Sequence, residues 1–177
     1  MKPDTTPRPL TLILGIGNEW AADDGVGPQV VRCVQQAWAA RGRNATREVG
    51  FVVMARPDLS LLDHLADARR LIIVDAVVSG ATPGTLHRQV WRPGATESRG
   101  VERASSHGFG VEELLQMAAA LGKLPPLVEL WGIEIASTEP GSGLTPAVAR
   151  AMEQTARELL ALLPTPAHPQ PPSQRHA

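Results

Sequence analysis

The sequence predicts an α/β protein in which helices cover both faces of a mostly parallel sheet. Short apolar stretches alternate along the 177 residues with stretches whose apolar residues recur at helical spacing. This alternation is typical of parallel strands joined through helices. The hydrophobic content of 43% indicates a globular chain, and its length is sufficient to bury a core without disulfides.

Five stretches are predicted to be strands. Residues 9–17 form a short apolar run that ends in glycine, which indicates a buried strand. Residues 70–78 are almost continuously apolar and β-branched, as expected for a strand that is buried on both faces. Residues 84–91 alternate in polarity after a Pro-Gly turn and are expected at the edge of the sheet. The other two strands are expected at residues 47–55 and 126–136.

Four stretches are predicted to be helices. Residues 23–40 carry apolar side chains at helical spacing, and we expect Cys33 to be buried among them. Residues 57–68 should form a short helix with Pro57 at its start. Thr145 should cap a helix that has proline at its first position and runs to about residue 163. The remaining helix is expected at residues 110–122.

Composition excludes several classes of partner and site. The 17 basic and 18 acidic residues give a net charge of −1, so we expect neither a nucleic-acid partner nor an anionic membrane partner. No apolar run approaches the length of about 20 residues that a membrane span needs. Residues 1–9 lack the apolar core of a secretory signal, so we expect a cytoplasmic protein. A single cysteine excludes an internal disulfide and a cysteine-rich metal site.

Three side chains that can bind a metal ion are expected at one edge of the sheet. Asp24 follows the first strand, Asp75 lies where the third strand ends, and His107 lies in the long polar loop before a helix. Ligands of such sheets bind outside the carboxyl ends of the strands. Each residue also has a structural interpretation. Asp23 or Asp24 would cap a helix, Asp75 would pair with a loop amide, and His107 would be an ordinary loop histidine.

Common catalytic motifs do not account for this constellation. Trp20 occupies the position at which a dinucleotide-binding G-x-G-x-x-G fingerprint requires its third glycine. The sequence contains neither the G-x-S-x-G elbow of many serine hydrolases nor the H-E-x-x-H helix of zinc proteases. An unrelated α/β hydrolase or nucleotide-binding domain, in which the acids only cap helices, remains an alternative at this point.

Four segments together resemble the hydrogenase maturation endopeptidases. These enzymes remove the C-terminal extension from the large-subunit precursor of nickel–iron hydrogenases. The segments are GIGNEWAADDGVG (15–27), LIIVDAVVSGATPGT (71–85), SSHGFGVEELL (105–115) and GIEIASTEPGSGLTPAV (132–148). The resemblance implies a three-layer sandwich with a twisted, mostly parallel five-stranded sheet. It also implies one such domain over residues 1–163, followed by a tail (164–177) whose five prolines predict disorder.

The resemblance further implies the chemistry of the site. It assigns both metal binding and catalysis to Asp24, Asp75 and His107, where some members have glutamate in place of Asp24. Two carboxylates and one imidazole suit nickel, manganese or zinc, with the imidazole favouring the later metals, and three protein ligands leave coordination positions open. We therefore expect nickel to arrive bound to the precursor, and we expect the enzyme to be a monomer.

Two questions stay open from the sequence. Cleavage could be metal-assisted, or an aspartate could act as the general base. A nickel-binding assembly factor without protease activity would use the same three ligands. Residues 54–65 also depart from the Asp-Gly-Gly-Thr-like stretch that many members carry there, which bears on the choice of substrate subunit.

Overall fold

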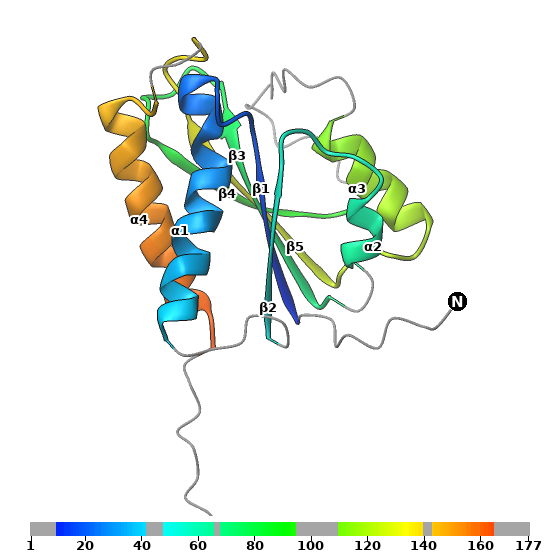
Figure 1. Ribbon diagram of the computed structural model, residues 1–177. Coiled ribbons are helices and arrows are strands. Elements are labelled where there is room, and N and C mark those ends of the chain that lie inside the picture. Colours follow the sequence, from blue (N-terminus) through cyan, green and yellow to red (C-terminus); the bar gives the residue numbers. More distant parts are fainter. Residues whose placement is uncertain (1–9, 42–47, 66–67, 95–109, 140–142, 165–177) are drawn as a thin grey trace, which may run out of the picture.

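The structure is a computed structural model that describes residues 10–41, 48–65, 68–94, 110–139 and 143–164. It confirms the predicted α/β class, with a five-stranded sheet between two layers of helices (Figure 1). Residues 165–177 of the predicted tail and the first nine residues lie outside the described part of the chain. In chain order the elements are β1 (Thr11–Ile16), η1 (Ala22–Gly25), α1 (Val26–Ala40), β2 (Val49–Met54), α2 (Leu61–Leu65), β3 (Arg70–Val77), β4 (Leu86–Trp91), α3 (Val111–Ala120), β5 (Leu127–Glu134) and α4 (Pro146–Leu162).

The strands follow the spatial order β2-β1-β3-β5-β4. The first four of these strands are mutually parallel, and β4 pairs with β5 in the antiparallel direction. The predicted edge position of residues 84–91 is therefore confirmed. β1 lies between β2 and β3. The chain therefore adds β2 next to one edge of β1 and later adds β3 next to its opposite edge. The carboxyl ends of β1 and β3 thus form a topological switch point, where open α/β sheets bind their ligands.

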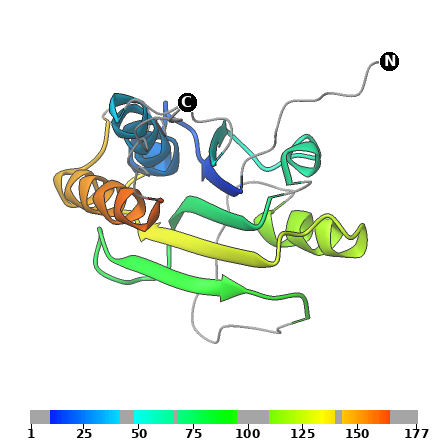
Figure 2. The ribbon, with the colours of Figure 1, turned by 90° about the horizontal axis from the view of Figure 1, so that it is seen from below.

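The central strands are apolar on both faces because each face is covered. On one face α1 and α4 lie side by side, and on the other lie α2 and α3 (Figures 1 and 2). Alternate residues of the strands point to opposite faces. Ile13, Ile72 and Ile133 belong to the core beneath α1 and α4. Leu14 and Ile73 belong to the core beneath α2 and α3.

Two local predictions are wrong. The second helix begins at Leu61 rather than at Pro57, because the Asp58 carboxylate accepts a hydrogen bond from the Ser60 backbone N–H at 2.8 Å and forms a turn first. Cys33 is exposed rather than buried. The buried stripe of α1 runs through Val30, Val34 and their neighbours, and Cys33 lies outside that stripe.

No helix in the described ranges is long and apolar enough to cross a membrane.

Candidate functional site

The loop between β1 and α1 is tightly folded against the switch point. Gly17 has a φ of 144°, and a Cβ there would collide with the carbonyl oxygen of Asp24. A Cβ on Gly27 would lie 2.5 Å from the carbonyl oxygens of both Ile16 and Val74. The backbone at the start of α1 therefore packs directly on the ends of β1 and β3. Only glycine permits these approaches, which explains the glycines that flank the two aspartates.

Asp23 is a structural residue of this loop. Its side chain is 0% exposed, and its carboxylate accepts hydrogen bonds from the Ala136 and Ser137 backbone N–H groups at 3.0 and 3.2 Å. It also accepts hydrogen bonds from the backbone N–H and the hydroxyl of Thr145, at 2.6 and 3.0 Å. Asp23 thereby fastens the β1–α1 loop to the segment that connects β5 with α4. Its neighbour Ala22 adopts the left-handed region at φ 41°, which a non-glycine residue maintains only where the surroundings hold it.

Asp24 follows Asp23 in η1, where its carbonyl oxygen lies against Gly17, and the residue is buried at 8% exposure. Its Oδ2 atom accepts a hydrogen bond from the Asn18 backbone N–H at 2.9 Å, which orients the carboxylate across the loop. The Asn18 side chain in turn accepts a hydrogen bond from the Trp20 N–H, so Asn18 helps to shape the loop. The N-cap positions of η1 and α1 are Ala21 and Gly25. Neither aspartate therefore occupies a cap position, and the alternative that they cap a helix is not supported.

Asp75 lies at the carboxyl end of β3, next in sequence to the Val74 carbonyl on which Gly27 packs. Its Oδ1 atom accepts a hydrogen bond from the following Ala76 N–H at 2.8 Å. The side chain is half-buried, on the sheet face that carries α2 and α3. There it helps to line a small pocket together with Ile73, Val111, Leu130, Trp131 and Gly132.

His107 lies outside the described residues, and with it most of the predicted loop at residues 92–108. Val111, four residues further along the chain, begins α3 and lines the same pocket as Asp75. Within the described ranges, no group of three or more potential metal ligands gathers at one point. The structure thus places Asp24 in the loop that follows β1 and Asp75 near the end of the adjacent parallel strand β3, and a metal site shared by these two residues and His107 stays a prediction.

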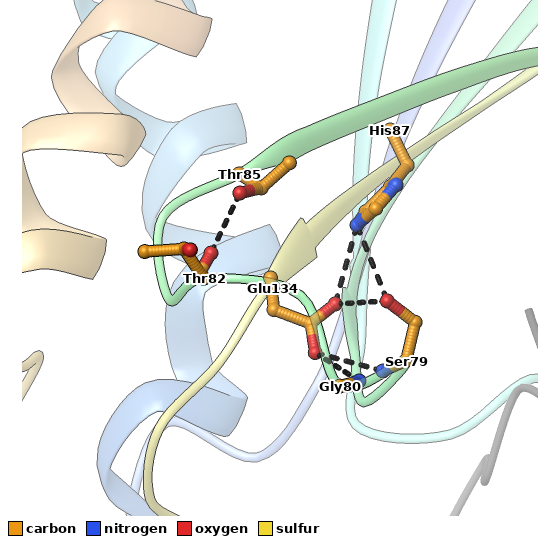
Figure 3. Close-up of polar contacts among 6 residues, drawn as sticks. All are labelled: Ser79, Gly80, Thr82, Thr85, His87 and Glu134. Atoms are coloured by element: carbon orange, nitrogen blue, oxygen red, sulfur yellow. Dashed lines mark hydrogen bonds and ion pairs between the residues drawn. The ribbon is translucent and has the colours of Figure 1, made fainter.

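Glu134 is the centre of a polar cluster that the sequence analysis did not identify (Figure 3). It ends β5 and is 1% exposed. Its carboxylate accepts hydrogen bonds from the backbone N–H groups of Ser79 and Gly80 at 2.8 and 2.9 Å, and from the Ser79 hydroxyl at 2.7 Å. Oε2 also lies 3.2 Å from His87 Nε2. An acidic residue within an apolar strand was the one available signal, since a buried carboxylate requires partners.

This cluster does not have the geometry of a serine-hydrolase triad. In a triad, the histidine bonds the serine through one ring nitrogen and the carboxylate through the other. Here Ser79 Oγ and His87 Nε2 both contact the same atom, Oε2 of Glu134. Ser79 Oγ and His87 Nε2 are 3.5 Å apart, at the limit of hydrogen bonding. The hydroxyl is therefore a donor to the carboxylate and is not activated by the imidazole.

The pKa of Glu134 is lower than its ordinary value of 4.5. Burial acts to raise this pKa, but the hydrogen bonds from Ser79, Gly80 and His87 favour the ionised form and outweigh burial. Because the pKa is lower in the folded state, the ionised carboxylate stabilises the fold at pH values above 4.5. That stabilisation is lost as the pH falls through the folded-state pKa.

Replacing Glu134 with glutamine is therefore expected to have a pH-dependent effect on stability. The free energy of unfolding should fall by about 2 kcal/mol at neutral pH, where hydrogen bonds to a charged carboxylate are lost. Below about pH 4.5 the free energies of unfolding of E134Q and of the unmodified protein should become more alike. Urea denaturation across a pH series measures both. The exposed Glu139 provides the control E139Q. A difference that stays constant or grows in acid would contradict the assignment of an ionised Glu134.

Comparison with known proteins identifies one family. A family model described as hydrogenase maturation protease matches residues 57–162. Hydrogenase expression/formation protein HupD of Rhodobacter capsulatus is 34% identical over 155 residues, which cover 85% of this chain and 71% of that protein. Hydrogenase 2 maturation protease of Escherichia coli K12 is 29% identical over 153 residues, or 86% of this chain and 89% of the relative. The solved structure of the hydrogenase maturating endopeptidase HybD from E. coli superposes with a TM-score of 0.66 and 28% identity, covering 85% of this chain and 90% of HybD.

Proposed function

The chain belongs to the hydrogenase maturation protease family, and we propose that its substrate is the nickel-loaded large-subunit precursor of a nickel–iron hydrogenase. The enzyme is a hydrolase of the endopeptidase type, like its relatives. In the reaction we propose, it cleaves the peptide bond that joins the C-terminal extension to the mature large subunit.

One observation carries the assignment of the site. Asp24 lies in η1, in the loop that follows β1, and Asp75 lies near the end of the adjacent parallel strand β3, while the backbone at Gly27 packs against the ends of both strands. Two acidic side chains held at a ligand-binding edge suit a divalent cation, because a cation offsets the repulsion between them. We assign Asp24 and Asp75 to the nickel that the precursor brings.

His107 completes the proposed set of ligands. The four-residue separation from Val111 corresponds to at most about 14 Å of extended chain, so the imidazole is within reach of the pocket that Asp75 lines. Two carboxylates and an imidazole form a donor set that suits nickel and leaves positions for ligands from the precursor. Each carboxylate can serve as a ligand or as the base that accepts a proton from the attacking water.

The decisive experiment compares two forms of one precursor. The purified enzyme is incubated with a nickel-loaded large-subunit precursor and, separately, with the same precursor prepared without nickel. Mass spectrometry then measures the mass of each precursor before and after incubation. We expect the mass to fall by that of the extension only in the loaded form. Efficient cleavage of the empty form would refute recognition through nickel. An unchanged mass for the loaded form would instead favour a nickel-binding assembly factor without protease activity.

The proposed site also bears on the oligomeric state of the enzyme, and the net charge bears on its other partners. All three proposed ligands come from one chain, so we expect the enzyme to act as a monomer. The net charge of −1 supports neither a nucleic-acid nor an anionic-membrane partner, and we expect the enzyme to act in the cytoplasm.

Exposed apolar side chains around the site are consistent with a protein substrate. Trp20, Leu59 and Val78 are 85%, 56% and 48% exposed, and they lie on the loops that follow β1, β2 and β3. The first two loops begin side by side, because Gly17 donates a hydrogen bond to the Met54 carbonyl at 3.1 Å. Large apolar side chains of this kind, tryptophan above all, are frequent anchors of protein interfaces.

Replacing Trp20 with alanine is expected to raise the KM for the precursor about tenfold, since truncating an aromatic anchor typically costs more than 1 kcal/mol of binding. The melting temperature should not change, because the side chain is almost fully exposed. Leu162, which is 47% exposed at the end of α4 and thus at the opposite edge, provides the control L162A. Equal KM values for the Trp20 variant and the unmodified enzyme would exclude Trp20 from substrate binding.

A further inference from the structure

The segment between β3 and β4 is fastened at both ends to a single residue, Glu134. At its beginning, the Glu134 carboxylate accepts the hydrogen bonds from Ser79 and Gly80. At its end, the Gly84 N–H donates to the Glu134 carbonyl at 2.8 Å, and the Glu134 N–H donates to the Thr85 carbonyl at 2.9 Å. Figure 3 shows the segment curving around the carboxylate. The path of the turn after β3, which begins four residues beyond Asp75 at Ser79, therefore depends on this residue.

Glu134 also holds a histidine on the sheet face that carries Asp75. The register places Asp75 of β3, Gly132 of β5 and His87 of β4 in one row across the sheet. Paired residues of neighbouring strands project to the same face, and strands lie about 4.8 Å apart. The Cα atoms of Asp75 and His87 are thus separated by about 10 Å, with a glycine between them. Glu134, two residues beyond Gly132 on the same face, orients the His87 ring through Nε2.

The carboxylate itself is not placed to touch a substrate. Its side chain is 2% exposed, whereas the side chain of His87 is 29% exposed. Both carboxylate oxygens are occupied by donors from the turn, and Oε2 also faces the imidazole. Burial of an ionised carboxylate is costly unless it is fully hydrogen-bonded, and an apolar residue in the same place would fill the space without that cost. What the carboxylate adds is a fixed geometry for the turn and for the histidine.

We propose that Glu134 is a positioning residue for precursor cleavage, which holds the turn after Asp75 and the His87 imidazole in the arrangement that the reaction requires. The proposal rests on the proposed function, because it concerns the same site. It adds a residue that acts through others, as the hydrogen-bond partners of metal-site and active-site groups commonly do.

The test measures kcat and KM separately with the nickel-loaded precursor at 20 °C. We expect E134A to lower kcat between about tenfold and 100-fold, the usual cost of losing such a partner, while KM stays within about threefold. E134Q should retain more activity than E134A, since one amide oxygen can still accept the hydrogen bonds from Ser79 and Gly80. E129Q is the matched control, because Glu129 is a partly buried carboxylate near the other end of β5, paired with Arg70.

The results separate positioning from general stability. Circular dichroism at 20 °C establishes that each variant is folded. A kcat for E134A equal to that of the unmodified enzyme, an increase in KM alone, or an equal loss of kcat in E129Q would each overturn the proposal. If E134A does not fold, the E134Q and Ser79→Ala variants provide the test. We expect each of them to lower kcat by about threefold or more, and an unchanged kcat in both would overturn the proposal.

Hydrogen exchange tests the same proposal without a substrate. The amides of Ser79 and Gly80 should exchange slowly in the unmodified enzyme and at least tenfold faster in E134A, since a partner worth about 1.4 kcal/mol is lost. If the unmodified enzyme does not cleave the nickel-loaded precursor, the proposed function is refuted. The hydrogen-exchange rates of Ser79 and Gly80 then test by themselves whether Glu134 fixes the turn. Equal exchange in the two proteins would overturn the role of Glu134 in either case.

Discussion

The D75N variant is expected to process a nickel-loaded precursor about 10³-fold more slowly than the unmodified enzyme while remaining folded. Asparagine has the size of aspartate and retains an oxygen that can accept the Ala76 hydrogen bond, so β3 should keep its end. It removes the negative charge that we assign to the substrate's nickel, and it removes the base. The rate of mass loss of the precursor measures the effect, with circular dichroism as the check on folding.

Two further variants sharpen this test. D75A also removes the oxygen ligand and should be at least as inactive as D75N. D63N makes the same chemical change at a side chain that is 86% exposed on α2, and its processing rate should be unaffected. A near-normal rate of precursor processing by D75N or D75A would show that Asp75 is not part of the active site.

The D23A variant is expected to lower the free energy of unfolding by about 3–5 kcal/mol. The substitution leaves four donors from Ala136, Ser137 and Thr145 without the carboxylate that they bind in a fully buried position. Each unsatisfied buried donor costs about 1–3 kcal/mol, and relaxation or entry of water recovers part of the sum. The loop that carries Asp24 should loosen from the segment before α4. Urea denaturation at neutral pH measures the loss.

A comparison among aspartates shows whether the loss of stability is specific to the buried Asp23. D63A should change the free energy of unfolding by no more than about 0.5 kcal/mol, as is usual for an exposed side chain. D23N keeps one acceptor oxygen and should fall between D23A and the unmodified protein. A loss below about 1 kcal/mol for D23A would show that Asp23 does not fasten the two loops.

The sequence was informative wherever a local pattern decides the structure. Continuous apolar runs identified the buried strands, and alternating polarity after a Pro-Gly turn identified β4 as an edge strand. The predicted start of α4 at Thr145 and Pro146 is confirmed, although the Thr145 hydroxyl donates to Asp23 and makes no cap hydrogen bond. The rule that ligands bind at the carboxyl ends of parallel strands led to the prediction that Asp24 and Asp75 share one edge, and their joint binding of a metal ion stays a prediction.

What could not be predicted depends on contacts between distant residues. Two adjacent aspartates look alike in sequence, yet Asp23 is separated by 113 to 122 residues from the donors that make it structural. The Glu134 cluster joins residues 47 to 55 positions apart and forms only once β4 and β5 pair. His87 alternates with its neighbours as any edge-strand residue does, so nothing local distinguished it. The role of His107 and the binding of nickel stay predictions.

The most direct test of the account is the position of a metal ion in a crystal of this enzyme grown with nickel and measured at the nickel absorption edge. We predict a single anomalous peak in contact with the carboxylates of Asp24 and Asp75 and with the imidazole of His107. A peak elsewhere, no peak, or electron density in which the two carboxylates point into separate regions would contradict the shared site on which the proposed function depends.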